Sequence, residues 1–276
     1  MTSGMTLVIG GTGKTGRRVV ERLKARNLPV RVGSRSGTPP FVWESPETWA
    51  EALRGVTSVY VTYYPDLAAR GAPEAIRAFL PVAKAARVQK LVLLSGRGEP
   101  ECQACEQMVR ECGIDYTIVR SSWFAQNFSE NYFLDGIKAG ELALPASNVG
   151  EPFIDIDDIA DVVVAALTDP RHSGQLYEMT GPRLLTFAEA VAEIARETKR
   201  DIRFVQVPIK DYTAGLASAH VPLEVVELVQ YLFSEVLDGR SSWIGDGVMR
   251  ALGRAPRDFS QYVRETAQTG VWDQAS

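Results

Sequence analysis

Residues 6–27 combine a short apolar strand, a glycine-rich turn and a helix. Thr6–Ile9 is apolar and β-branched, as strands buried in parallel sheets are. Gly10, Gly13 and Gly16 follow, and helical spacing of apolar residues begins directly behind them. Glycines in this arrangement let the chain turn tightly, bring backbone N–H groups close to a pyrophosphate and pack the helix on the strand. The segment therefore predicts a nucleotide-binding α/β unit.

This turn has two alternative interpretations, a P-loop and a structural turn. Gly13-Lys14-Thr15 matches the end of a P-loop, but that motif needs a glycine where this chain has Val8, so a P-loop is excluded. A purely structural turn without a ligand is the second alternative. The strand before the turn and the helix after it favour a dinucleotide site.

Short apolar strands and helices alternate through the first half of the chain. Expected strands are 6–9, 30–32, 56–62, 90–95, 116–119 and 175–179, and expected helices are 14–26, 46–54, 73–86, 101–111 and 157–168. This alternation is typical of βαβ units and predicts an α/β fold with a doubly wound parallel sheet, the Rossmann fold. We expect the core to comprise 1–122 and 151–182. A smaller, mostly helical C-terminal cap would comprise 123–150 and 183–276, with one strand near 202–207.

Charge and composition exclude several classes of protein. The 276 residues carry 30 Lys and Arg against 34 Asp and Glu, a net charge of −4, and no dense basic run, which argues against a nucleic-acid partner. Apolar stretches such as 162–167 are far shorter than the ~20 residues that span a bilayer. Three cysteines cannot build a disulfide framework, and the first five residues lack a signal-peptide pattern. We therefore expect a cytoplasmic protein without a membrane partner.

The residues after the second strand indicate which nicotinamide cofactor is bound. An acidic residue there binds the ribose 2′-hydroxyl, whereas an arginine accommodates a 2′-phosphate. This chain has Ser34-Arg35-Ser36 and no carboxylate before Glu44, and Lys14 could add a second cation. The alternative is that Arg35 is only a solvated loop charge. The pattern favours NADP(H) as the cofactor.

Five segments together resemble a known family. Residues 10–16, 91–95 and 115–128 are similar to the NmrA-like atypical short-chain dehydrogenases/reductases, as are 153–160 and 174–182. Residues 41–44, with Trp49 nearby, resemble a subgroup that includes NAD(P)H:quinone oxidoreductases and ergot-alkaloid iminium reductases.

The resemblance implies a role for individual residues. The pyrophosphate would be lined by Gly10, Thr12, Gly13, Lys14 and Thr15, and the adenosine phosphate held by Ser34, Arg35 and Ser36. The nicotinamide side would be flanked by Thr62, Tyr63, Tyr64, Ser95, Gly96 and Arg97. Strand carboxyl ends converge on the ligand crevice of an open α/β sheet, which agrees with these placements.

The usual acid of short-chain dehydrogenases is missing. These enzymes use a tyrosine four residues before a lysine, and none of the nine tyrosines here has lysine at that position. Hydride delivery to an ordinary ketone builds an alkoxide that needs a proton donor, whereas an iminium ion needs none. A quinone or conjugated carbonyl is intermediate, because its developing anion is delocalised. We therefore expect an NAD(P)H-dependent reductase of such electron-poor small molecules.

Several side chains remain candidates for the chemistry. Candidate acids are Tyr63, Tyr64, Ser95 and Tyr132, and the expected substrate wall contains Trp123, Phe124, Phe128, Tyr132 and Phe133. Each of these aromatic residues could alternatively pack in the core. The alternative function is a non-catalytic NADP(H)-binding regulator that reports redox state to a protein partner. A homodimer is the expected assembly, if one forms.

Two further clusters predict no site. Cys105 and Cys112 share one face of an expected helix with apolar residues, as core residues do, so that face and the nearby Cys102 indicate no zinc centre. Asp155, Asp157, Asp158 and Asp161 crowd one stretch and are expected to cap a helix or to be solvated.

Overall fold

The computed structural model describes residues 4–273, which form two compact units. Unit 1 contains the described residues through Ser121, Asp157–Met179 and Asp246–Arg254. Unit 2 contains Ser122–Ile156, Thr180–Gly245 and the described residues from Ala255 onward. Residues 1–3 and 274–276, which the predicted domains include, lie outside the described residues.

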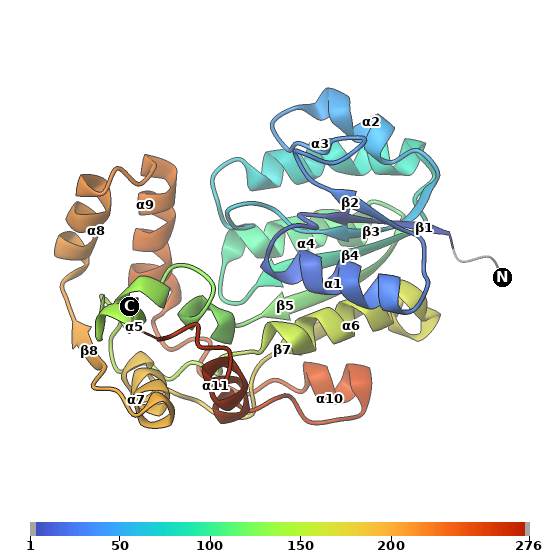
Figure 1. Ribbon diagram of the computed structural model, residues 1–276. Coiled ribbons are helices and arrows are strands. Elements are labelled where there is room, and N and C mark those ends of the chain that lie inside the picture. The colour runs from blue at the N-terminus through green and yellow to red at the C-terminus, as the bar shows by residue number, and fades with distance from the viewer. Residues whose placement is uncertain (1–3, 274–276) are drawn as a thin grey trace. The chain divides into compact units, whose positions relative to one another are not determined.

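The core of unit 1 is a six-stranded parallel sheet (Figure 1). The strand order is β2-β1-β3-β4-β5-β7. The strands are β1 (Met5–Ile9), β2 (Val30–Gly33), β3 (Val56–Val61), β4 (Lys90–Gly96), β5 (Asp115–Ser121) and β7 (Gln175–Met179). Their apolar residues, such as Leu7, Val59 and Leu91, are fully buried, as strands covered on both faces require. The predicted doubly wound Rossmann-like fold is confirmed.

Helices cover both faces of this sheet. They are α1 (Lys14–Ala25), α2 (Trp49–Ala52), α3 (Ala72–Ala85), α4 (Pro100–Glu111), α6 (Ile156–Thr168) and α10 (Gly247–Leu252). In Figure 1, α1 and α6 lie on one face and α2 and α3 on the other, and α4 packs against α3. The helix expected at 46–54 forms as a 3-10 turn, Pro46–Thr48, followed by the short α2. Among residues 4–273, no helix combines the length and the apolar character that crossing a bilayer requires.

The two units differ from the predicted domains at several segments. Residues 246–254 belong to unit 1, although the sequence analysis assigned them to the cap. The reason is close packing of α10 on β7: a Cβ atom at Gly247 would lie 2.5 Å from the carbonyl oxygen of Glu178. Arg250 also places its guanidinium 5.3 Å from the centre of the Tyr177 ring. Residues 122, 151–156 and 180–182, predicted as core, belong to unit 2.

Unit 2 is mostly helical and has its own apolar core. Its helices are α5 (Leu134–Ala139), α7 (Phe187–Thr198), α8 (Ile209–Ser218), α9 (Leu223–Tyr231) and α11 (Phe259–Ala267). The expected strand near 202–207 is β8 (Arg203–Gln206), which pairs in parallel with β6 (Glu141–Leu144). β6 was not predicted, because four residues in an aromatic and loop-rich stretch give too short a pattern.

Candidate functional site

The glycine turn after β1 is packed too closely for any other residue at two positions. Gly10 has φ +65°, and a Cβ atom there would lie 2.5 Å from the Thr62 hydroxyl oxygen. A Cβ atom at Gly16 would lie only 2.2 Å from the carbonyl oxygen of Gly10. The Gly13 amide closes the turn by donating to the same carbonyl, at 2.8 Å. At its glycines the turn therefore presents backbone close to the start of α1.

The N-terminus of α1 has the chemistry of an anion site. Its cap, Gly13, offers no side chain to bond the first N–H groups of the helix, and the first turn contains no acidic residue. Lys14 is the first residue of the helix, and the Nε of Arg18, one turn later, lies 3.5 Å from Asp157 Oδ1. The free N–H groups of a helix N-terminus and the positive end of its dipole both favour a bound anion. A pyrophosphate fits these residues.

The carboxyl ends of β1 and β3 meet beside this turn. β2 and β3 lie on opposite sides of β1, which makes the carboxyl edge between β1 and β3 the topological switch point of the sheet. Thr62, directly after β3, donates its hydroxyl to the carbonyl of Ile9 at 3.0 Å. The structure thus brings the predicted pyrophosphate segment and the predicted nicotinamide-side residue Thr62 to one place in unit 1.

Arg31 and Arg35, four residues apart, differ in whether their guanidinium groups are hydrogen-bonded. Arg31 donates to the carbonyl oxygens of Ala52 and Arg54 at 2.6 and 2.9 Å, so its guanidinium is committed to the fold. Arg35 is exposed, and among residues 4–273 the structure gives it no hydrogen bond or ion pair. The hydroxyl oxygens of Ser34 and Ser36 lie 3.5 Å apart on either side of it. The guanidinium of Arg35 is therefore available for a phosphate.

Ser95 and Arg97 belong to a buried network that the sequence analysis missed. Ser95 donates its hydroxyl to Glu106 Oε1 at 2.7 Å, and Arg120 Nε donates to the same oxygen at 2.8 Å. Arg120 also contacts Glu178 Oε1 at 2.7 Å, and Arg97 Nε donates to Glu178 Oε2 at 3.0 Å. The bonds to Glu106 raise the pKa of Arg120 above its usual range. The two acids thus fix the side chains of Ser95 and Arg97.

The signal for this network was present only in the strand register. Ser95 on β4 is opposite Arg120 on β5, and Arg120 is opposite Glu178 on β7. Glu106 is 2% exposed on the sheet-facing side of α4, where a charged residue looks misplaced until its partner is known. A register prediction combined with the search for charge partners could have found the set.

The predicted tyrosines differ in their surroundings. Tyr63 is half-buried with its ring centre 5.2 Å from that of Trp43, whose indole N–H donates to the Thr62 carbonyl at 3.0 Å. Burial, together with the nearby acid Glu44, raises the pKa of Tyr63, so its phenol is protonated at neutral pH. Tyr64 is 74% exposed, and Tyr132, in unit 2, is 51% exposed.

The cysteines are individual core thiols. Cys102 and Cys105 are buried and Cys112 is half-buried. Burial raises the pKa of Cys105 to about 12, which leaves it an unreactive thiol at neutral pH. Cys102 donates its thiol to the carboxyl group of Glu99.

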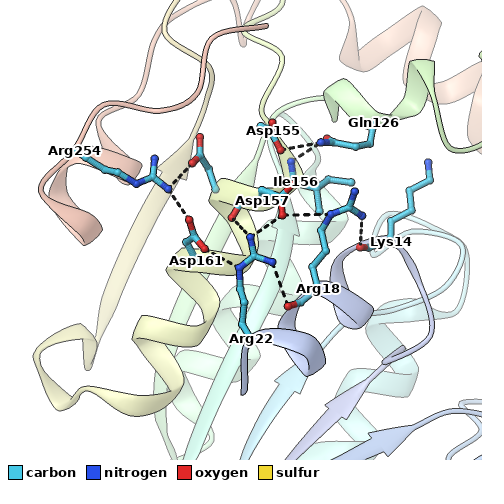
Figure 2. A network of polar contacts seen from close by, with 10 residues as sticks. Lys14, Arg18, Arg22, Gln126, Asp155, Ile156, Asp157, Asp161 and Arg254 are labelled. Atoms are coloured by element: carbon cyan, nitrogen blue, oxygen red, sulfur yellow. Dashed lines mark hydrogen bonds and ion pairs between the residues drawn. The ribbon is translucent and has the colours of Figure 1, made fainter. Parts of the chain in front are cut away.

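The expectation that the aspartates near 157 are solvated is wrong. Arg22 on α1 binds Asp157 at 2.6 Å and Asp161 at 2.7 Å, and Arg254 binds Asp158 at 2.7 Å and Asp161 at 2.6 Å. Figure 2 shows Arg22 and Arg254 reaching the acids of α6 from two different segments. Asp158 is completely buried. These ion pairs attach α1 and the 246–254 segment to α6.

The predicted substrate aromatics lie in unit 2. Phe128 is completely buried in a cluster with Phe133 and Phe153, so its ring serves the core. The Trp123 ring is half-buried, with its centre 5.1 Å from that of Phe233, and Phe124 is also half-buried.

The fourth predicted aspartate, Asp155, also lies in unit 2. It accepts from the Gln126 amide at 2.8 Å and is buried, so it too is not solvated.

Comparison with known proteins places the chain in a family. Residues 103–263 match the NmrA-like family, and the whole chain is 30% identical to agroclavine dehydrogenase of Claviceps fusiformis, over 96% of this chain and 98% of the relative. The chain belongs to the NmrA-like family. This NmrA-like protein is also 28% identical to NAD(P)H azoreductase of Xenophilus azovorans, over 95% of the chain and 98% of the relative. The predicted family resemblance is confirmed.

Solved structures show the same fold at lower sequence identity. The NADPH-dependent quinone oxidoreductase of Escherichia coli, solved in complex with NADPH, matches this NmrA-like chain with a TM-score of 0.76 and 19% identity. The match covers 95% of this chain and 99% of the oxidoreductase. The likeness therefore extends over both units.

Proposed function

We propose that this NmrA-like protein is an NADPH-dependent oxidoreductase that reduces a small electron-poor acceptor: a quinone, an iminium ion or a conjugated carbonyl compound. The observation that carries the proposal is the N-terminus of α1, which has no side-chain cap and follows a turn that requires glycine at positions 10 and 16. Relatives named as an azoreductase and an agroclavine dehydrogenase support a reductase rather than a simple binding protein.

The residues of unit 1 fit a dinucleotide in an extended pose. Backbone N–H groups of the turn and of the first residues of α1 bind the pyrophosphate, with Lys14 adding charge. Arg35, flanked by two serine hydroxyls, binds the 2′-phosphate with its planar set of donors. The nicotinamide side is assigned to the residues after β3 and β4, namely Thr62, Tyr63, Tyr64, Ser95, Gly96 and Arg97.

The side chains of the proposed site restrict which acceptors can be reduced. A bound dihydronicotinamide supplies a hydride. Without a Tyr–Lys pair, the protein favours acceptors whose reduced form is neutral or is a delocalised anion. The Ser95 hydroxyl already donates to Glu106, so we assign it a structural role and not that of proton donor to the acceptor. Trp123, Phe124 and Tyr132 are the proposed contacts of the acceptor.

Steady-state oxidation of NADPH tests this function. The purified chain is assayed with a panel of quinones, cyclic iminium ions and conjugated carbonyl compounds, and with simple ketones as controls. We expect turnover with at least one electron-poor class and none with the ketones. Tight binding of NADPH with no turnover of any acceptor would instead support the non-catalytic regulator.

A further inference from the structure

Two loops at the carboxyl edge of the unit 1 sheet bring two acids together. Asp66 lies in the loop after β3 and Glu99 in the loop after β4. One carboxyl oxygen from each, together with the sulfur of Cys102, lie within 4.8 Å of one another. Cys102 donates its thiol to Glu99 Oε2 at 2.7 Å, and Ala68 donates its backbone N–H to Asp66 at 2.8 Å.

This pair adjoins the residues assigned to the nicotinamide side. The carboxyl group of Glu99 rests on Gly96, the last residue of β4, because a Cβ atom there would lie 2.0 Å from Glu99 Oε2. Asp66 follows Tyr63 by three residues in the same loop. The carboxyl ends of β3 and β4 thus carry both the proposed nicotinamide contacts and the acid pair.

Among the residues that the structure describes, the groups that act on the pKa of Glu99 include no cation. Glu99 is 6% exposed, and the charged and polar groups that act on it are Asp66, Cys102 and Glu101. Burial is the largest effect and, with the neighbouring Asp66, raises the pKa of Glu99 to about 8. Burial also raises the pKa of Asp66. Glu99 is buried and Asp66 is half-buried. Two acids at this separation share a proton at neutral pH, because ionising both would place two like charges side by side.

We propose that the Asp66–Glu99 pair is the proton source of the reductase and stands in for the absent Tyr–Lys pair. This inference rests on the proposed function. For a conjugated carbonyl or quinone, the acceptor gains a hydride with its electron pair and, at its oxygen, the proton of Glu99. The O–H bond of Glu99 breaks as the O–H bond of the reduced acceptor forms, directly or through one water. The resulting carboxylate regains its proton from solvent.

The Asp66–Glu99 pair should not affect the reduction of an iminium ion. Hydride alone turns an iminium ion into a neutral amine, so no proton is required in that step. The pair therefore affects some acceptors and not others, and a structural role would not discriminate between them.

The first test needs neither cofactor nor acceptor. The infrared band of protonated carboxyl groups is followed between pH 5 and pH 10 in the wild-type chain, in Glu99→Gln and in Glu111→Gln. Glu111 is the matched control, because it is an exposed acid on the same helix as Cys102. We expect a band at pH 7 that disappears near pH 8 in the wild type and in the control and is absent in Glu99→Gln. A wild-type chain without that band at pH 7 would overturn the inference.

The second test compares two acceptors in the same variants. In Glu99→Gln we expect kcat with a conjugated carbonyl or quinone to fall at least tenfold, and kcat with an iminium ion to change less than twofold. Removing the neighbouring charge in Asp66→Asn should move the alkaline fall of the carbonyl rate to lower pH, which gives a second readout if Glu99→Gln fails to fold.

The outcomes separate the two proposals. Equal loss with both acceptors, or no loss with either, contradicts the assignment of Glu99 while leaving the reductase intact. If none of the tested acceptors supports NADPH oxidation by the wild-type chain, the proposed function is wrong and this inference fails with it.

Discussion

At the scale of single residues, the partners of a charge decide its role more than its type does. Arg31 lies within β2 and Arg35 lies two residues after it, yet Arg31 is bonded to two backbone carbonyls and Arg35 is exposed. The position of Arg35 relative to the glycine turn could be predicted from the sequence, because that spacing is local. The pairing of Arg22 with Asp157 could not, because the partners are 135 residues apart.

Replacing Arg35 tests the choice of cofactor. Arg35→Ala should weaken binding of NADPH by about 10- to 100-fold, since a hydrogen bond to a charged group contributes about 1.5–3 kcal/mol. Binding of NADH should change little, because NADH lacks the 2′-phosphate. Titration calorimetry with both nucleotides measures this, and Arg26→Ala, an exposed arginine after α1, is the control. Equal losses for the two nucleotides would contradict the role of Arg35.

At the scale of elements, the turn and the helix behind it form one unit. The turn has to be built of glycines because the backbone at Gly10 and the backbone at Gly16 approach each other closely. The uncapped start of α1 is a cost to an isolated helix, and an anion bound there offsets it. This combination was predictable from a single segment of sequence, because all of its parts are neighbours in the chain.

Gly16→Ala tests the close approach within the turn. The added methyl group meets the Gly10 carbonyl, so we expect the free energy of unfolding to fall by about 1–3 kcal/mol and dinucleotide binding to be lost. Gly215→Ala is the matched control, because a Cβ atom at that position in α8 meets nothing within 4 Å. Alanine there should be neutral or stabilising. If both variants bind NADPH like the wild type, the proposed geometry of the turn is incorrect.

The attachment of residues 246–254 to α6 gives a second prediction at this scale. Arg254→Ala removes a partner of the fully buried Asp158 and should lower the free energy of unfolding by about 1–2 kcal/mol. This is less than for a fully buried pair, because the Arg254 side chain is 38% exposed and water screens it. Urea unfolding measures the change. Arg240→Ala, which breaks an exposed pair with Asp238, should leave the midpoint almost unchanged, and equal effects would argue against the anchoring role.

At the scale of the whole molecule, the sequence predicts what is local and misses what is distant. The six strands of unit 1 were all predicted, because each is a short apolar run beside a turn or a helix. β6 was missed because its four residues, in a loop-rich stretch, give too short a pattern, and its partner β8 follows about 60 residues later. The return of residues 246–254 to unit 1 depends on the contact of Gly247 with Glu178, which no local pattern records. The buried acids Glu106 and Glu99 were missed for the same reason.

Calorimetric titration of the purified chain with NADPH and with NADH tests the account most directly. Every proposal here requires a dinucleotide at the N-terminus of α1 with its extra phosphate on Arg35. We predict one NADPH per chain, bound at least tenfold more tightly than NADH. A chain that binds neither nucleotide, or binds both with equal affinity, would contradict the account.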